Sequence, residues 1–245
     1  MKNRVGEKHI TNEGCEIEII EYISAANITI RFKSGIILNN RTYQNIKKGQ
    51  IKNPNIKNIC EVGYFGVGRY GTKQHRKLYV VWTNMIRRCY DEEVREKCPT
   101  YKDVTVCEEW HNFQNFAGWF EENWKEYMNS EWHLDKDVLY PDCKIYSPET
   151  CCFLPREINN AFNRHTSKRG EFLIGTNRSG LKIQARISKY GKSLFIGYFN
   201  TSEEAFQAYK VAKEEYIKEL AEKWKSLIKS KVYQALINYK MKKDD

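Results

Sequence analysis

Hydrophobic and polar positions alternate in two runs near the start of the chain. In GCEIEIIEYI, glutamates and isoleucines alternate from Glu16 to Ile19, and the period slips by one position at Ile20. Alternation of this kind is typical of strands with one buried face. NITIRF repeats the pattern, and SGII and NNRT supply turns. We therefore expect a small β-rich module over residues 1–58, for which an SH3-like barrel is a suitable architecture.

Basic residues and glycines gather at the end of this module and just beyond it. The run YQNIKKGQIKNPNIK carries lysines that form either the solvated face of a packing module or a contact with nucleic acid, and the sequence leaves both open. The next run holds Gly63, Gly66, Gly68 and Gly71 among four basic side chains. Its glycine spacing does not fit a dinucleotide fingerprint. We predict a flexible basic linker over residues 59–77.

Helical spacing of large apolar residues dominates residues 78–128. Two stripes recur every three or four positions, one formed by Trp82, Met85, Ile86 and Cys89 and the other by Phe113, Phe116, Phe120 and Trp124. Between them, YKDVTVC is short and β-like. Aromatic stripes of this kind usually form a core, so we expect these helices to be the packing frame for the segment that follows.

The last part of the chain predicts a sheet covered by a helix. LKIQARISKYGKSLFIGYF alternates over two strands joined at Tyr190-Gly191-Lys192, a hairpin turn. A helix should start at Thr201, because its hydroxyl can cap the helix while Glu204 reaches back, as in a capping box. On the first strand, a polar face of Lys182, Gln184, Arg186 and Ser188 lies opposite an apolar face of Leu181, Ile183, Ala185 and Ile187. We expect the apolar face to pack on the helix and the polar face to be available to a partner.

The charge of the chain is unevenly distributed and indicates a polyanionic partner. The 245 residues carry a net charge of +10, with balances of +8 over residues 1–80, −7 over 81–155 and +9 over 156–245. Contacts of Lys and Arg with phosphates supply most non-specific affinity for nucleic acid, so the two basic ends suit that partner. The acidic middle is more tolerable beside DNA if some of its carboxylates hold a divalent cation.

Composition also excludes several classes of protein. No apolar run of roughly 18 residues occurs, and MKNRVGEKHI lacks the apolar core of a signal peptide. We therefore expect no membrane partner and a cytoplasmic location. The eight cysteines include no CxxC pair, so no structural zinc is expected, and buried reduced thiols are the simplest interpretation.

The run GKSLFIGYFNTSEEAFQAYKVAK resembles the ethylene-response-factor (Apetala-type) DNA-binding domain, which also occurs in nucleases of phages and mobile elements. The resemblance covers residues 170–216 and implies three strands and a helix, with the sheet in the major groove of double-stranded DNA. By position it implies DNA contacts from Asn177 and Arg186, with Ser188, Ser193 and Phe195 behind them. Arg186 has the side chain that can read guanine through O6 and N7.

Other basic residues of this domain extend the set of candidate DNA contacts. The family has an arginine-rich first strand, whereas LIGTNRSG offers Arg178 alone, so non-specific or shape-led binding is the expectation. The predicted DNA-binding residues are Asn177, Arg178, Lys182, Gln184, Arg186, Ser188, Lys189 and Lys192. The alternative is a structural unit with a solvated basic face.

Four runs within residues 82–163 resemble phage-type HNH endonucleases, in the order WTNMIRRCY, YKDVTVCEEWHNFQNFAGWF, HLDKDVL and YSPETCCF. The resemblance implies a ββα unit in which an acidic residue and a general-base His end one strand. An Asn orients that His, and a His or Asn on the following helix completes a metal site. Asp135 keeps the acid, but Lys136 stands where the base belongs and Thr150 stands where the orienting Asn belongs. The helix offers three asparagines, Asn159, Asn160 and Asn163.

The chemistry of DNA cleavage shows what these replacements mean. The reaction needs a deprotonated water in line with the phosphorus and a metal ion on the leaving oxygen. A lysine is ordinarily protonated at neutral pH and is a poor base unless burial changes this, although it can hold phosphate. On a strand, alternate residues share a face, so the histidine and carboxylates of HLDKD could bind Mg²⁺ and supply a base. The predicted catalytic residues are His133, Asp135 and Lys136, and the predicted Mg²⁺ ligands are Asp135, Asp137, Asn159 and Asn163. The alternative is that Asp137 and Lys136 are surface charges and that His133 is a satisfied histidine.

The sequence thus predicts an α+β chain with four segments. These are the β-module (1–58), the linker (59–77), an HNH-like nuclease domain (78–165), and an ethylene-response-factor-like domain with a helical tail (166–245). The favoured function is Mg²⁺-dependent cleavage of double-stranded DNA by an endonuclease of phage or mobile-element type in the cytoplasm of a bacterial host cell. The alternative is a nuclease-derived protein that no longer cuts and acts as a DNA-binding regulator or as an inhibitor of a host factor, with a host or phage protein as partner. RNA is a third alternative, because basic ends do not distinguish it from DNA.

Overall fold

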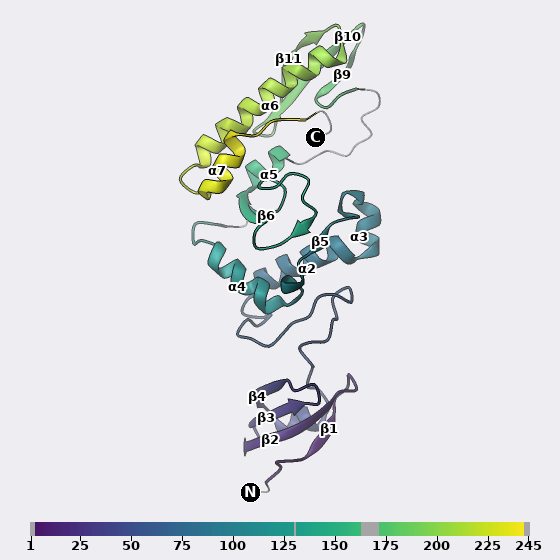
Figure 1. The fold of residues 1–245 in the computed structure, drawn as a ribbon, viewed down its shortest axis with the longest axis vertical. Coiled ribbons are helices and arrows are strands. Elements are labelled where there is room, and N and C mark those ends of the chain that lie inside the picture. Colours follow the sequence, from purple (N-terminus) through teal and green to yellow (C-terminus); the bar gives the residue numbers. More distant parts are fainter. Residues whose placement is uncertain (1–2, 130, 163–171, 243–245) are drawn as a thin grey trace. The chain divides into compact units, whose positions relative to one another are not determined.

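The structure is a computed structural model that describes residues 3–129, 131–162 and 172–242. It contains helices and several small sheets, which confirms the predicted α+β class (Figure 1). The chain divides into two compact units, Met1–Gly118 and Trp119–Asp245. The division lies inside residues 78–165, the range that the sequence predicts as one domain.

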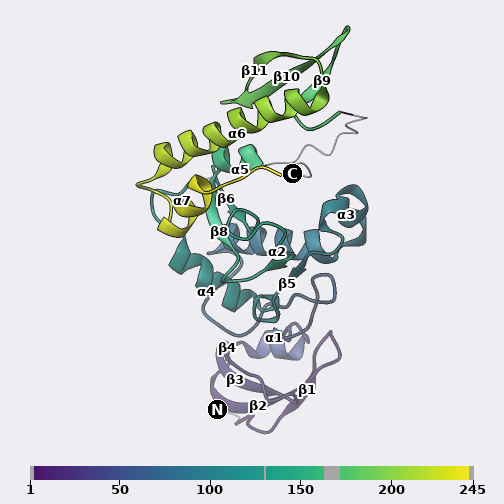
Figure 2. The ribbon, with the colours of Figure 1, turned by 45° about the horizontal axis from the view of Figure 1, so that its top comes forward.

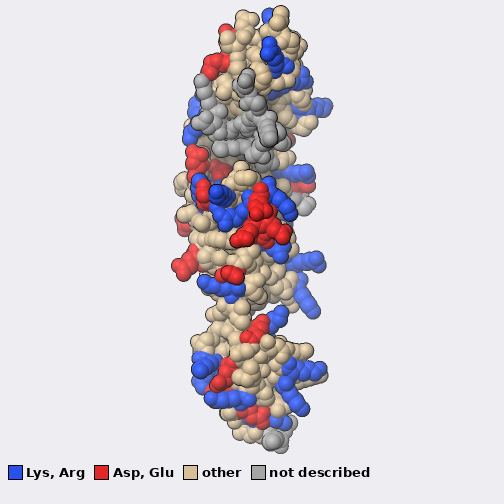
Figure 3. Space-filling model, turned by 90° about the vertical axis from the view of Figure 1, so that its right-hand side faces the viewer, with Lys and Arg blue, Asp and Glu red and all other residues tan. Residues whose placement is uncertain are grey.

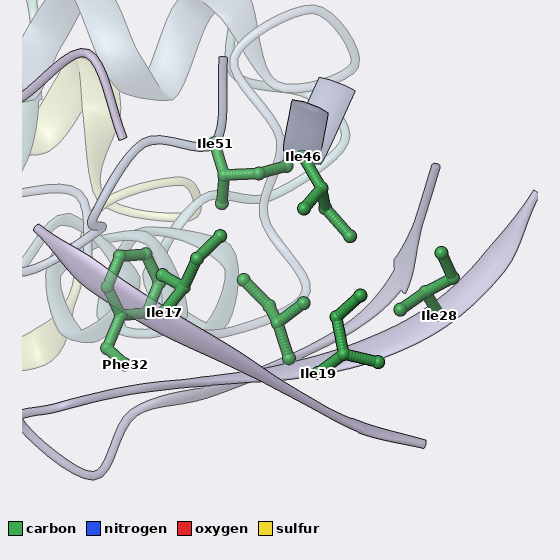
Figure 4. Close-up of a cluster of buried hydrophobic side chains, with 7 residues drawn as sticks. Ile17, Ile19, Ile28, Phe32, Ile46 and Ile51 are labelled. Carbon is green, nitrogen blue, oxygen red and sulfur yellow. The ribbon is translucent and has the colours of Figure 1, made fainter. Parts of the chain in front are cut away.

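The first unit begins with an open antiparallel sheet and a short helix. Its elements are β1 (Lys8–Ile10), β2 (Glu16–Ser24), β3 (Asn27–Phe32), β4 (Ile37–Arg41) and α1 (Tyr43–Lys47). Apolar side chains of β2, β3, α1 and Ile51 form its buried core (Figure 4). The predicted slip at Ile20 is confirmed by a shift of register between Ile19 and Glu21 in the β2–β3 pair. The strand order β1-β2-β3-β4 leaves β1 and β4 as the edges of the sheet.

Residues 59–77 are packed, and the prediction of a flexible linker was wrong. Tyr70 is buried, and its amide donates to Gln114 Oε1 at 3.0 Å. Gln114 Nε2 donates in turn to the carbonyls of Phe65 and Tyr70 at 3.2 and 3.1 Å. A Cβ on Gly68 would lie 2.3 Å from the Gln114 side chain. The glycine therefore permits close approach of the backbone to a buried amide, and the amide fixes the segment.

The remainder of the frame consists of helices and short turns. Its elements are α2 (Arg76–Tyr90), α3 (Glu92–Lys97), η1 (Pro99–Tyr101), β5 (Thr105–Val106), η2 (Glu108–His111) and α4 (Phe113–Asn123). The four apolar residues of the α2 stripe are buried, as predicted, and Trp82 Nε1 donates to the carbonyl of Trp110 at 2.7 Å. Within the β-like run YKDVTVC, Thr105 and Val106 form β5.

A strand–strand–helix unit follows in the second compact unit (Figure 2). Its elements are β6 (Trp132–Asp135), β8 (Cys152–Pro155) and α5 (Arg156–Phe162), with β7 (Ile145–Tyr146) in the connection between the strands. β6 and β8 are antiparallel, with His133 opposite Leu154 and Asp135 opposite Cys152. The predicted ββα topology is therefore present, and Cys152 is a buried thiol of its core.

The chain ends in a three-stranded antiparallel sheet and two helices. These are β9 (Thr176–Ser179), β10 (Lys182–Lys189), β11 (Lys192–Phe199), α6 (Ser202–Trp224) and α7 (Ser230–Ile237), with strand order β11-β10-β9. Tyr190 and Gly191 have φ of 52° and 75°, as a two-residue hairpin turn requires. The predicted capping box of Thr201 and Glu204 is present at the start of α6. This helix runs along one side of the sheet (Figures 1 and 2).

Among the helices of the described residues, we find none that combines the length and apolar character of a membrane span.

Candidate functional site

One side of the β9–β11 sheet is polar and exposed, and the other packs on α6. Ala185 and Ile187 of β10 are buried, whereas Arg186 between them is exposed. Residues that pair across an antiparallel ladder share a face, so the partner of Gln184 on β9, Asn177, lies on the same side as Arg186. We call this side the outer face and define it by Asn177, Lys182, Gln184, Arg186 and Ser188. Five of the eight predicted DNA-binding residues lie on it.

The other three predicted contacts, Arg178, Lys189 and Lys192, lie on the opposite side of the sheet. Arg178 pairs with Ile183, and Lys192 pairs with Lys189, so all three follow the alternation of the buried positions. The Lys189 side chain is 18% exposed, and its Nζ lies 2.9 Å from Glu219 Oε1 on α6. The sequence of β10 already indicated that Lys189 lies on the buried side, because Lys189 and Ile187 are two residues apart on one strand.

Arg186 is oriented by its neighbour on β11. Its Nε donates to Ser193 Oγ at 3.0 Å, and one terminal nitrogen donates to the carbonyl of Ser193 at 3.3 Å. A guanidinium has five N–H donors, so further donors are available for a phosphate or a guanine edge. The two bonds fix the side chain across the sheet before any ligand arrives.

Two exposed aromatic residues lie on the outer face, and of these Tyr198 was missed in the sequence. Phe195 pairs with Arg186, and Tyr198 pairs with Gln184, so both rings share the outer face. Simple alternation would put positions 195 and 198 on opposite faces, but the register shifts between Ala185 and Arg186. A glycine inside a strand often marks such a bulge, and Gly197 was the signal available in the sequence.

The strands of this sheet and the turns between them carry basic residues and no acidic ones. No Asp or Glu occurs from Phe172 to Ser202, whereas this stretch holds Arg178, Lys182, Arg186 and two further lysines. Figure 3 shows basic side chains at many separate places on the visible face, among larger areas of other residues. The distribution of acidic residues is more informative, because a polyanion is repelled wherever carboxylates gather.

In the ββα unit, a histidine and an asparagine meet between strand and helix. Asn159 Nδ2 on α5 lies 3.4 Å from His133 Nδ1 on β6. Asn159 is therefore placed beside the strand histidine. Asn163 lies outside the described residues. The pairing suits either orientation of a catalytic imidazole or a structural tie between the two elements.

Asp135 ends β6 as a buried carboxylate. Its Oδ1 accepts hydrogen bonds from the amides of Asp137 and Val138 at 3.0 and 2.9 Å. Burial raises the pKa of Asp135 to about 6, and the charge of Asp137 acts in the same direction, while the two amide donors oppose it. Both donors use one oxygen, which leaves Oδ2 for another ligand.

Lys136 is buried and bonded, and it is not the surface charge of the alternative interpretation. Its Nζ donates to Asp137 Oδ1 at 2.5 Å and to the carbonyl of Cys143 at 2.9 Å, and it lies 5.8 Å from the ring centroid of Tyr146. An ammonium group that donates to a carboxylate and a carbonyl holds the connection between β6 and β8 together. In this arrangement Nζ is a hydrogen-bond donor to both partners.

The predicted trio of His133, Asp135 and Asp137 does not lie on one strand face. β6 ends at Asp135, so Asp137 lies beyond the strand and its side chain is 58% exposed. Within the described ranges, no group of three His, Cys, Asp or Glu is placed to hold a metal ion. The turn after Asp135 directs the carboxylates of Asp135 and Asp137 to different partners, and binding of Mg²⁺ at HLDKD stays a prediction.

Thr150 also has a local role. Its Oγ1 donates to the carbonyl of Ile145 at 2.7 Å and accepts from the amide of Ser147 at 3.0 Å. These bonds close the turn before β8, which is a usual role of threonine in turns. Thr150 therefore does not take over the orientation of a histidine.

The helix α6 contacts α5 as well as the sheet. Glu157 in the first turn of α5 accepts from Lys223 Nζ at 2.7 Å and from Trp224 Nε1 at 2.8 Å. At the other end of α5, Lys213 Nζ donates to the carbonyl of Ala161 at 2.5 Å. Burial lowers the pKa of Lys213. One helix thus supports both candidate sites of the second unit.

Comparison of the chain with family models, with curated proteins and with solved structures finds no match in any of the three. The fold and the contacts described above are therefore the basis of the functional conclusion.

Proposed function

We propose that this chain binds double-stranded DNA through the outer face of the β9–β11 sheet, in the cytoplasm of a bacterial host cell. The observation that carries the proposal is the exposed polar face with Arg186 at its centre, backed by α6 and free of carboxylates along the strands. Lys182 and Arg186 supply contacts with phosphates, and Asn177 and Gln184 supply amides for base edges. The basic residues elsewhere in the chain add affinity that does not depend on sequence.

The test compares two arginine substitutions on opposite sides of the sheet. Arg186→Ala should weaken binding of a labelled 20-base-pair duplex about tenfold at modest salt, which corresponds to about 1.4 kcal/mol. Arg178→Ala removes the same charge from the α6 side and should have a smaller effect. Fluorescence anisotropy over a range of salt concentrations measures both affinities. Equal effects of the two substitutions, or affinity that is independent of salt, would contradict the proposal.

A second candidate function is cleavage of that DNA, and the contact between His133 and Asn159 favours it. A histidine held by an asparagine inside a ββα unit is the arrangement from which a general base could act. A bound Mg²⁺ would supply charge neutralisation at the leaving oxygen. The bonding of Lys136 and the placement of Asp137 instead favour the rival, a nuclease-derived regulator, or an inhibitor of a host factor, that binds DNA without cutting it.

Incubation of purified protein with supercoiled plasmid and Mg²⁺ or Mn²⁺ separates the two candidates. Nicked or linear product that disappears in both His133→Ala and Asp135→Ala, with plasmid binding retained, supports cleavage. A set of plasmids that together carry the host and phage DNA supplies all natural target sites. Binding of these plasmids without any nicked or linear product supports the regulator that binds DNA without cutting it. Product that persists in both variants comes from a contaminating nuclease and excludes a role for this site.

A further inference from the structure

We propose that the outer face carries a site for an unstacked nucleotide base, formed by Phe195 and Tyr198, so that the chain prefers duplex DNA with an unpaired base to a continuous duplex. This inference rests on the DNA binding proposed above and specifies its substrate. It begins from an irregularity of the β10–β11 pair.

The bulge in β11 is what brings the two rings together. Ala185 pairs with Gly197, but Arg186 pairs with Phe195, so Ile196 is an extra residue on β11. Without the extra residue, positions three apart on a strand would point to opposite sides of the sheet. Bulges bend a strand and redirect side chains, and they are frequent beside functional sites. Here the bulge adds a second aromatic ring to the outer face.

The two rings are exposed in a way that a packed core does not require. Phe195 is 48% and Tyr198 is 55% exposed, and their ring centroids lie 4.9 Å apart at an interplanar angle of 58°. The rings contact each other at an angle, so neither covers the full face of the other. Each aromatic ring offers a π-face to a base, and every base can stack on such a face.

The polar groups around the rings suit a nucleic acid. Arg186 lies opposite Phe195, and Gln184 lies opposite Tyr198, on the central strand β10. Arg186 can hold a phosphate, and Gln184 offers a donor and an acceptor to the edge of a base that has left the stack. The absence of acidic residues from Phe172 to Ser202 provides the charge complementarity. A base that is paired and stacked keeps both of its faces covered, so the rings select an unpaired one.

An apolar protein partner or a second copy of the chain is the competing occupant. Its surface would bury Phe195 and Tyr198 together with their charged neighbours, and charged residues are depleted at the centres of protein interfaces. The lysine and arginine content of the strands therefore favours the nucleic acid. The measurement below distinguishes the two occupants.

The experiment measures the affinity of the full chain for three labelled DNAs by fluorescence anisotropy. The first is a continuous 20-base-pair duplex, the second is the same duplex with one unpaired thymine at its centre, and the third is the single strand. The wild-type protein should bind the bulged duplex about tenfold more tightly than the continuous duplex, as one base–aromatic stack provides. The double variant Phe195→Ala/Tyr198→Ala should bind both duplexes alike.

Matched variants separate stacking from loss of apolar surface. Leu194→Ala removes a side chain that is 45% exposed on the same strand but pairs with Ile187 on the α6 side, and it should keep the preference. Phe195→Leu/Tyr198→Leu keeps the apolar volume without the rings and should lose the preference. Phe195→Trp should retain it. Thermal unfolding shows which variants are folded, and the leucine variant gives the result if the alanine variant is not.

The outcomes are distinct for this inference and for DNA binding itself. Equal affinity of the wild-type protein for the two duplexes, or a preference that survives in the leucine variant, overturns the base site and leaves duplex binding intact. Preference for the single strand over both duplexes also overturns it, because the duplex contacts would then be dispensable. Self-association that is lost in the leucine variant, without any DNA preference, assigns the rings to an interface between copies. If the wild-type protein binds none of the three DNAs, the proposed function is overturned as well.

Discussion

Substituting Asp135 by Asn should stabilise the protein at neutral pH, because the folded chain holds this carboxylate where its charge is unfavourable. Burial raises the pKa of Asp135 from 3.8 to about 6. The folded state therefore binds the proton more tightly than the unfolded state, and stability decreases as the pH rises from about 4 to about 6. Asn keeps an oxygen for the amides of Asp137 and Val138 and removes the charge.

The magnitude follows from the two pKa values. The destabilisation by Asp135 is about 1 kcal/mol at pH 4.5 and approaches about 3 kcal/mol at pH 7.5, since one pKa unit corresponds to 1.36 kcal/mol. The stability gained by Asp135→Asn should therefore grow by about 2 kcal/mol between these pH values. Asp142→Asn is the matched control, because that carboxylate is 66% exposed and its substitution should change stability by less than about 0.5 kcal/mol at either pH.

Urea unfolding followed by tryptophan fluorescence at pH 4.5 and pH 7.5 measures these differences. Trp119, Trp124, Trp132 and Trp224 all lie in the second unit and report on it. A variant that is no more stable than the wild-type protein at pH 7.5, or a gain that is the same at both pH values, would refute the reasoning. Asp135 would then be ionised in the folded protein without cost.

Three packing predictions complete the set. Gln114→Leu should destabilise the first unit by about 2–4 kcal/mol in thermal unfolding, since three backbone groups of Phe65 and Tyr70 lose a hydrogen bond. A near-neutral result would contradict the proposal that Gln114 fixes residues 59–77. Gly175→Ala should be more destabilising than Gly180→Ala, because both glycines have positive φ but only a Cβ at position 175 would lie 2.2 Å from the Tyr209 ring. Equal losses of stability would show that the backbone angle φ alone sets the cost. Lys136→Met should destabilise the protein less than Lys136→Ala, because Met retains the buried aliphatic stem of the side chain. The reverse order of stabilities would show that packing of this stem is unimportant.

The sequence could predict the elements whose signals are local. The alternation in β2 and its slip at Ile20, the capping box of Thr201 and Glu204, and the Tyr190-Gly191 turn each depend on a few neighbouring residues, and each is present. The face of β10 that meets α6 was also readable from the period of two. These features need no knowledge of distant contacts.

Features that depend on distant partners could not be predicted in the same way. The glycines of residues 59–77 look like a linker until Gln114 is placed beside them, about forty residues later in the chain. The extra residue at Ile196 depends on the register with β10, which a single strand does not specify. Lys136 follows a buried strand and finds its partners only when Cys143 folds back to it. In each case the structure depends on a contact with a residue that is distant in the sequence.

The continuity of α6 has a consequence for how the second unit can change. This helix has 23 residues, which corresponds to a rod of about 34 Å, and it contacts the hairpin through Tyr216 and α5 through Lys213 and Lys223. Inserting one residue into a helix rotates everything beyond it by about 100°, which would separate one of these contacts from its partner. Restoring the phase with seven residues would not help, because Tyr216 lies between Lys213 and Lys223 and any such insertion there would also move the two α5 contacts apart by about 10 Å. The sheet and α5 are thus held on the same stretch of α6, and the spacing between them cannot be changed by lengthening that stretch.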